Sequence, residues 1–333
     1  MRVAVLTLFL VFVFLTPVFP QLPDFYKDVD RVTWVVDDLT KTMEGWRALG
    51  FQDMQEFGEV DLTSELYRGQ PQDGRARLAI GRLGSVNVTW LQPTSGTSLY
   101  SDFLKRKGPG IIGLTHRTPT ITALENEVTR LSGLGVPVLA RGTIPTGSGE
   151  IAYVYFDTER DGKYILGLIH FPADIVPDPT PRGPANLKLS QYAFVVKELD
   201  QVSAYWQKLG FPALSVTHGP LTNLKHRGQL GQFDQKLGWQ RHGNIVYEWI
   251  LPLKGPTVYD EHLSAHGEGF HHLAFDVDDM DKASADWTQK GFPIVQSGGW
   301  GDEGKPGSGR FAYSDTTGIG GVMIEFLWNY KTQ

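Results

Sequence analysis

Apolar and polar positions follow the same order four times along the chain. An apolar strand-like run is followed by acidic residues, by apolar residues at helical spacing, and then by three short strand-like runs. The first copy starts with "VTWVVDDLTKTMEGWRALGF" (32–51), and the last starts with "FHHLAFDVDDMDKASADWTQKGF" (270–292). Asp38 and Asp279 stand where a helix N-cap is expected, and Gly-Phe pairs at 50–51, 210–211 and 291–292 end three of the helices. The pattern predicts four tandem β-α-β-β-β modules.

The four modules form two homologous halves. "RVTWVVDDLTKTMEGWRALGF" (31–51) returns as "QYAFVVKELDQVSAYWQKLGF" (191–211), at an offset of 160 residues. A segment with five prolines, residues 171–190, separates the halves and is typical of an exposed, stiff linker. The sequence therefore predicts an α+β fold with an N-terminal domain over 28–172, a Pro-rich linker over 173–189 and a C-terminal domain over 190–330.

The N-terminus departs from this pattern. Residues 3–15 form an apolar run after Arg2, which is short for a membrane span and typical of a secretory signal. Val18-Phe19-Pro20 does not resemble a small-residue cleavage site, so an uncleaved anchor is the alternative. We expect residues 1–21 to be a signal peptide or N-terminal anchor and the protein to be secreted or periplasmic. Membrane association is expected only if the segment is retained.

Charge and cysteine content exclude several classes of function. The net charge of −6, without a Lys/Arg-rich run, argues against a nucleic-acid partner. The chain has 0 cysteines, which excludes disulfides, thiolate nucleophiles, iron–sulfur clusters and cysteine-ligated zinc. We expect a small-molecule substrate and a monomer or homodimer, because tandem halves can pair within one chain.

The stretch "GEGFHHLAFDVDDMD" (267–281) carries a family likeness. Together with the four modules it resembles the vicinal oxygen chelate superfamily, which includes glyoxalase I, bleomycin resistance proteins, methylmalonyl-CoA epimerase and extradiol dioxygenases. The resemblance covers residues 28–330 and is strongest to the epimerase branch. It implies two paired-module domains, each forming a cup, with a divalent metal held by residues of the first and last strand of each module. Carried over by position, the ligands in the C-terminal half are Gln191, Glu248, His272 and Glu325.

The same positions in the N-terminal half hold no comparable set. They are Arg31, Thr89, Gly113 and Gly167, a cation, a hydroxyl and two residues without a side-chain donor. The resemblance therefore implies a degenerate first half that keeps the fold without the metal. His116 and His170 miss these positions, and we interpret them as ordinary core or surface histidines.

Strand periodicity supports the assignment in the second half. Glu248 and Glu325 each share a strand face with apolar neighbours, where an unpaired carboxylate is costly to bury. His272 shares its face with Ala274 and Asp276, the small and polar side suited to a cleft. His271 falls on the opposite face, which should pack on helices, and is predicted to be a structural histidine or a support for the ligand set.

One imidazole, two carboxylates and one amide form an oxygen-rich set that suits Mn, Co, Mg, Ni or Zn, with Fe less favoured. The resemblance then implies an epimerase, isomerase or lyase that chelates an oxygen-rich substrate and stabilises an enolate. Glu248 or Glu325 is the candidate catalytic base, and Glu268 and His242 are weaker candidates. Two alternatives remain open: a small-molecule sequestration protein of the bleomycin-resistance type without turnover, and an extradiol-type dioxygenase.

Overall fold

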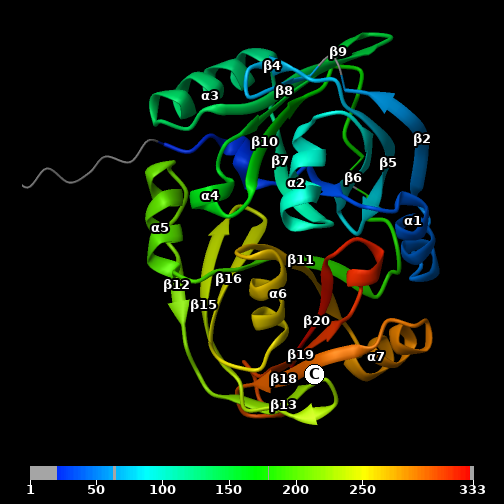
Figure 1. Ribbon diagram of the computed structural model, residues 1–333. Helices are drawn as coiled ribbons and strands as arrows, with labels where there is room; N and C mark the ends of the chain where they lie inside the picture. The colour runs from blue at the N-terminus through cyan, green and yellow to red at the C-terminus, as the bar shows by residue number, and fades with distance from the viewer. Residues whose placement is uncertain (1–20, 63–64, 179, 331–333) are drawn as a thin grey trace, which may run out of the picture.

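The computed structural model describes residues 21–62, 65–178 and 180–330 (Figure 1). Most of the predicted signal segment therefore lies outside the described residues. The N-terminal half is blue to green in Figure 1 and lies above the C-terminal half, which runs from green to red. Each half is built around its own sheet of ten strands.

The strands of the two sheets correspond one to one. The first sheet contains β1 (Arg31–Val35), β2 (Met54–Asp61), β3 (Leu66–Tyr67), β4 (Gln70–Pro71), β5 (Arg75–Leu83), β6 (Val86–Ser95), β7 (Gly110–Arg117), β8 (Val138–Thr146), β9 (Gly149–Phe156) and β10 (Ile165–His170). The second contains β11 (Leu187–Val195), β12 (Ser215–Thr217), β13 (Leu221–His226), β14 (Gln229–Leu230), β15 (Asp234–His242), β16 (Ile245–Lys254), β17 (Gly269–Val277), β18 (Ile294–Trp300), β19 (Gly309–Ser314) and β20 (Met323–Asn329).

Both sheets have the same strand order. It is β2-β5-β6-β1-β7-β10-β9-β8-β3-β4 in the first and β12-β15-β16-β11-β17-β20-β19-β18-β13-β14 in the second. In each sheet the first strands of two modules run antiparallel at the centre, and each is parallel to the last strand of its own module. The predicted α+β fold of four paired modules is confirmed.

The helices are α1 (Leu39–Ala48), α2 (Leu99–Lys107), α3 (Ile121–Gly133), α4 (Glu159–Gly162), α5 (Leu199–Lys208), α6 (Val258–His266) and α7 (Met280–Gln289), with 3-10 turns η1 (Asp24–Lys27) and η2 (Thr317–Ile319). Most helices cover the outer faces of the sheets, whereas α2 and α6 pack on the concave side, each against the cup of its own half. The predicted N-caps form: a carboxylate oxygen of Asp38 accepts from the Lys41 amide at 3.0 Å, and one of Asp279 accepts from the Lys282 amide at 2.9 Å. These bonds satisfy free amides of the first helical turn.

The sequence pattern predicted neither the helices α2 and α6 nor the hairpins β3–β4 and β13–β14. Both missed helices join the two modules of a half and begin at a hydroxyl N-cap, Ser98 or Thr257. The segment of α6 carries no strong apolar stripe, whereas that of α2 carries one comparable with α1 and was still not indicated by the pattern.

One apolar core joins the halves. Module two meets module three where Tyr164 stacks on Trp206, with ring centroids 4.7 Å apart. Module one meets module four where the Trp34 indole N–H donates to the Gly320 carbonyl at 2.6 Å. Tyr164, Trp206 and Trp34 are buried, and burying each such ring contributes on the order of 2 kcal/mol. The halves therefore pack as an intramolecular pair, and each cup opens on the other side of its sheet.

Within the described residues, no helix has the length and apolar character needed to cross a membrane.

Candidate metal centre

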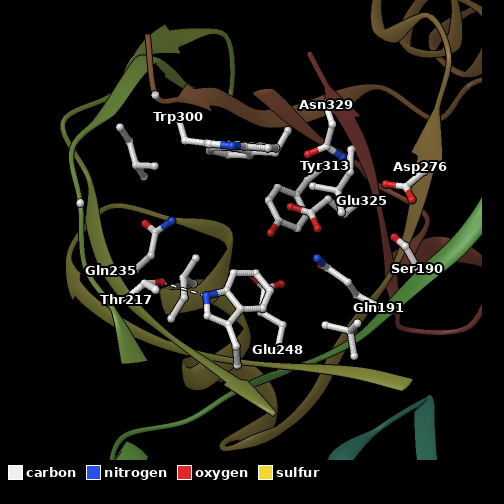
Figure 2. A pocket seen from close by; sticks show the side chains of 18 of the residues that line it. Ser190, Gln191, Thr217, Gln235, Glu248, Asp276, Trp300, Tyr313, Glu325 and Asn329 are labelled. Atoms are coloured by element: carbon white, nitrogen blue, oxygen red, sulfur yellow. Dashed lines mark hydrogen bonds between the residues drawn. The ribbon is translucent and has the colours of Figure 1, made fainter. Parts of the chain in front are cut away.

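The concave face of the second sheet encloses a cavity of about 680 Å³ (Figure 2). Gln191 from β11, Glu248 from β16 and Glu325 from β20 line it. Figure 2 shows these three side chains directed into the same part of the cup. Aromatic side chains also line the cavity: Trp239 pairs with Glu248 across the β15–β16 ladder, and Trp300 comes from β18.

Strand register brings the predicted residues together. Ala193 of β11 pairs with Glu248 on one side and with His272 on the other, so these two flank one position of the central strand. Glu325 pairs with Ala274, two residues beyond His272 on β17. Because side chains alternate along strands, His272, Glu248 and Glu325 all face the cup.

The three side chains form one tight, buried cluster. Glu325 Oε2 lies 3.2 Å and Glu248 Oε2 lies 3.4 Å from His272 Nε2. One ligand atom from each of the three residues lies within 4.8 Å of the others. His272 is 0% exposed, Glu325 3% and Glu248 5%. The histidine and both glutamates predicted from the sequence therefore meet at one point.

Gln191 completes the edge of the cluster. Its side chain is partly buried, and its Oε1 atom is enclosed without a hydrogen-bond partner among the described residues. An enclosed carbonyl oxygen without a donor is costly, whereas a cation would satisfy it. This unpaired oxygen supports a place for Gln191 in the ligand set.

Electrostatics distinguish this cluster from ordinary buried pairs. Burial raises the pKa of Glu248. Burial also acts to lower the pKa of His272, but the carboxylates of Glu325 and Glu248 outweigh it and raise that pKa to about 9. Even with His272 protonated, two ionised glutamates would leave an excess negative charge inside the protein. The residues therefore fit a divalent cation, which balances two carboxylates and accepts nitrogen and oxygen donors.

His271 does not lie where strand alternation places it. The ladder between β11 and β17 shifts, because Ala193 pairs with His272 but Phe194 pairs with Phe270, which leaves His271 as the extra residue of a β-bulge. Its Nδ1 lies 2.9 Å from Nδ1 of His272. The expectation that His271 shares the helix-packed face with Leu273 is therefore wrong, because a bulge breaks the period of two.

Two tyrosines that the sequence analysis missed stand beside the cluster. The Tyr259 hydroxyl, from α6, donates to the Tyr313 hydroxyl, from β19, at 2.8 Å. The Tyr313 ring lies 5.0 Å from the His272 ring, and Tyr313 pairs directly with Glu325 across the ladder. Burial and the nearby glutamates raise the pKa of Tyr313 well above its usual value, so its hydroxyl stays protonated. The repeat "GSGRFAY" was the signal that could have indicated Tyr313.

The first half has no equivalent cluster. Arg31 occupies the position of Gln191 and donates to Thr89, in the position of Glu248, at 2.9 Å. A Cβ at Gly113 would overlap the carbonyl oxygen of Ile165, and one at Gly167 would lie 2.5 Å from the Thr115 hydroxyl. The Ile165 backbone occupies one of the two remaining ligand positions, and the Thr115 and Tyr155 side chains occupy the other.

A different carboxylate fills the first cup. Glu65 is fully buried and accepts from the hydroxyls of Tyr100 and Tyr153 at 3.1 and 2.8 Å, and also from the Gln72 amide. Burial raises the pKa of Glu65. Because three donors already satisfy it, we interpret this group as structural.

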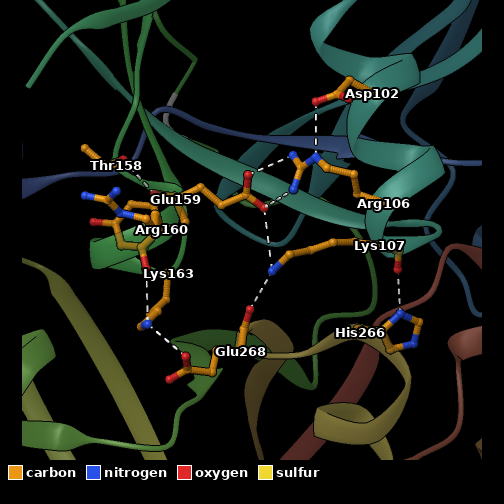
Figure 3. Close-up of polar contacts among 10 residues, drawn as sticks. Asp102, Arg106, Lys107, Thr158, Glu159, Arg160, Lys163, His266 and Glu268 are labelled. Atoms are coloured by element: carbon orange, nitrogen blue, oxygen red, sulfur yellow. Dashed lines mark hydrogen bonds and ion pairs between the residues drawn. The ribbon is translucent and has the colours of Figure 1, made fainter.

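The weaker candidates for the catalytic base lie outside the cup. Glu268 bridges the halves, with Lys163 Nζ 2.9 Å from its Oε2 and Lys107 Nζ donating to its backbone carbonyl at 2.6 Å (Figure 3). His242 is half-buried and lies beside Phe211, a residue of the shared core. Of the two histidines set aside, His116 is buried and His170 lies beside the Thr118 carbonyl.

Comparisons with known proteins agree with this architecture. Residues 190–313 match the family model described as the glyoxalase/bleomycin resistance protein/dioxygenase superfamily. Among solved structures, a mutant of 4-hydroxymandelate synthase from Streptomyces coelicolor is 16% identical, with a TM-score of 0.63 over 92% of this chain and 93% of that chain.

A second solved structure, a fusion of a xylose isomerase-like TIM barrel and 4-hydroxyphenylpyruvate dioxygenase, is also 16% identical. It has a TM-score of 0.55 over 92% of this chain and 50% of that chain. At such identities these likenesses show the fold alone. No curated protein matches the chain in sequence.

Proposed function

Because residues 190–313 match the family model of the glyoxalase/bleomycin resistance protein/dioxygenase superfamily, we propose that the chain is a divalent-metal-dependent enzyme acting on a small substrate in its C-terminal cup. The observation that carries the proposal is the buried cluster of Glu248, His272 and Glu325, with Gln191 beside it. These four residues would hold the cation. When bound, a divalent cation supplies Lewis-acid stabilisation of negative charge developing on a carbonyl oxygen.

The reaction class we propose is removal and return of a proton next to a carbonyl group, as in an epimerase or isomerase, or a related lyase reaction. Glu248 is the candidate base, because burial raises the proton affinity of its carboxylate, and Glu325 is the other candidate. The Tyr313 hydroxyl receives a hydrogen bond from Tyr259, so its own proton is directed elsewhere and can orient a substrate oxygen.

The cavity limits the substrate to a small molecule with a flat or apolar portion. Its volume of about 680 Å³ suits a metabolite-sized ligand. Trp239, Trp300 and Phe311 provide aromatic walls, and Gln235 and Asn329 provide polar groups near them. We propose a substrate that presents two neighbouring oxygens to the ligand cluster and its remaining surface to the tryptophans.

Oxygen chemistry is the second candidate. The whole-chain likeness to a 4-hydroxymandelate synthase favours it at the level of fold. The donor set argues against it, since iron oxygenases commonly use two histidines and one carboxylate, whereas this cluster has one histidine and two glutamates.

We also propose that the chain is exported and that its first half supports the second. Export rests on the apolar run of residues 3–15. The supporting role rests on the shared core and on the closed ligand positions of the first half.

The test starts from the bound metal. The purified protein, reconstituted with Mn²⁺, Co²⁺ or Zn²⁺, should bind one ion per chain by elemental analysis, and His272→Ala should bind none. Exchange of solvent deuterium into a panel of oxo and hydroxy acids then tests proton removal. A wild type without stoichiometric metal would refute the enzyme proposal and favour sequestration. A metal-loaded protein that exchanges no proton but consumes dioxygen would favour the second candidate.

A further inference from the structure

We propose that His271 is a positioning residue for the metal centre: its Nδ1 accepts a hydrogen bond from Nδ1–H of His272 and so keeps Nε2 of His272 free to bind the ion. This inference rests on the proposed metal site. It assigns a function to a buried histidine that the fold alone does not require.

The geometry places the two imidazoles edge to edge. The Nδ1 atoms of His271 and His272 are 2.9 Å apart, a hydrogen-bond distance. Nε2 of His272 faces Glu325 and Glu248, so Nε2 is directed at the ligand cluster and Nδ1 at His271. A neutral imidazole that binds a metal through Nε2 carries its proton on Nδ1, and that N–H needs an acceptor.

Among the described residues, His271 is the acceptor that lies within hydrogen-bond distance of Nδ1 of His272. Metal-bound histidines usually donate the second N–H to a carboxylate or a backbone carbonyl. Here the nearest partner of that nitrogen is another imidazole, which interacts with the Val258 backbone and lies among three further rings. The neighbours are Tyr259 at 5.3 Å, His262 at 5.1 Å and Tyr313 at 5.9 Å between centroids.

The first half provides an internal comparison. Its ladder contains the same bulge, because Thr33 pairs with Gly113 and Trp34 pairs with Ile111, which makes Ile112 the extra residue. Ile112 packs with Phe103 of α2 in an apolar cluster. The bulge and its burial therefore do not require a histidine.

The polar replacements occur only in the half that carries the ligand cluster. His271 stands where the first half has Ile112, and His262 of α6 stands where it has Phe103 of α2. His271 is 2% exposed, so a polar ring there carries a desolvation cost that an isoleucine avoids. Support of the neighbouring ligand accounts for that cost.

Three variants separate hydrogen bonding from packing. His271→Ile inserts the residue that this fold already accepts at the equivalent bulge and removes the acceptor. His271→Asn keeps an acceptor, because its side-chain oxygen takes the place of Nδ1. His262→Phe is the matched control, since it replaces a ring beside His271 with the residue that the first half has at the equivalent position, Phe103. Unfolding midpoints and near-ultraviolet circular dichroism verify that each variant folds.

The readout is the dissociation constant for Co²⁺ at fixed pH, followed by the visible absorption of the bound ion. We expect His271→Ile to weaken binding by about 10- to 100-fold, and His271→Asn and His262→Phe to stay within about threefold of the wild type. Unchanged Co²⁺ affinity in His271→Ile, or an equal loss in His271→Asn, would overturn the role of His271 while leaving the metal site intact. A wild type that binds no Co²⁺ would instead refute the proposed function itself.

A measurement on the unmodified protein covers the case in which His271→Ile does not fold. Nitrogen-15 NMR of the Zn²⁺-loaded wild type should show His272 protonated on Nδ1 and His271 protonated on Nε2. The reverse arrangement, with the proton on Nδ1 of His271, would overturn the inference.

Discussion

Metal binding at the C-terminal cup should depend steeply on pH. In the metal-free protein, Glu325 and Glu248 raise the pKa of His272 to about 9 despite its burial. A proton and a metal ion compete for the same Nε2 atom, so the ion must displace that proton at any pH below about 9. The perturbation is therefore a change of pH alone, with no change of sequence.

The size of the effect follows from the pKa. At pH 7, two units below a pKa of about 9, only about 1 in 100 metal-free molecules has a deprotonated His272. Displacing the proton then costs about 3 kcal/mol. Between pH 6.5 and 8.5 the apparent affinity should increase by about 100-fold. The raised pKa of Glu248 acts in the same direction, because a proton on that carboxylate also competes with the metal.

Isothermal titration with Zn²⁺ or Co²⁺ provides the assay. Titrations at several pH values give the affinity, and buffers of different ionisation enthalpy give the number of protons released, which should be about one at pH 7. The buried His116 does not interfere, because burial lowers its pKa to about 4 and keeps it neutral throughout this range. An affinity that stays constant between pH 6.5 and 8.5, or no proton release, would refute the reasoning.

Three further outcomes are expected. Without metal, stability to urea should be greatest near pH 6.5 and fall as the pH rises through about 9, by up to about 3 kcal/mol, because the raised pKa of His272 favours the fold only while the ring is protonated. A stability that rises between pH 6.5 and 9 would contradict this. Glu65→Ala should destabilise the protein by about 1–3 kcal/mol, since it leaves the Tyr100 and Tyr153 hydroxyls without their acceptor, yet metal affinity should stay unchanged. Chemical denaturation measures the stability and Co²⁺ titration the affinity. A loss of metal binding would show that the two cups are coupled. Gly309→Ala should weaken substrate binding without changing the affinity for Co²⁺, because a Cβ there would overlap the Trp300 indole that lines the cavity. Tryptophan fluorescence should report the displaced indole, and an unaltered spectrum would contradict the prediction.

The repeat determined how much of the fold could be predicted. Two matched segments 160 residues apart, with acidic N-caps and Gly-Phe endings, were enough to predict four modules, because hydrophobic period and caps act locally. The helices α2 and α6 were missed, since short connecting helices depend on the surfaces they cover. The hairpin β3–β4 was missed for a different reason, because strands of two residues have no period to detect.

The site was predictable where strand alternation holds. Glu248, Glu325 and His272 were placed on the cup face by period-2 counting together with the family resemblance, and the register brings them together. His271 was misplaced because a bulge depends on pairing with β11, which a single strand sequence does not reveal. Tyr313 was missed because its role comes from its position opposite Glu325 across the ladder.

The glycines of the first cup bear on how the two halves can change over evolutionary time. Gly113 and Gly167 allow the backbone and the Thr115 side chain to occupy the space that a returning histidine or glutamate would need. Each single step back towards a ligand would therefore meet a steric clash and lower stability before any metal could compensate. The two glycines therefore make a ligand set of this kind harder to place in the first half than in the second.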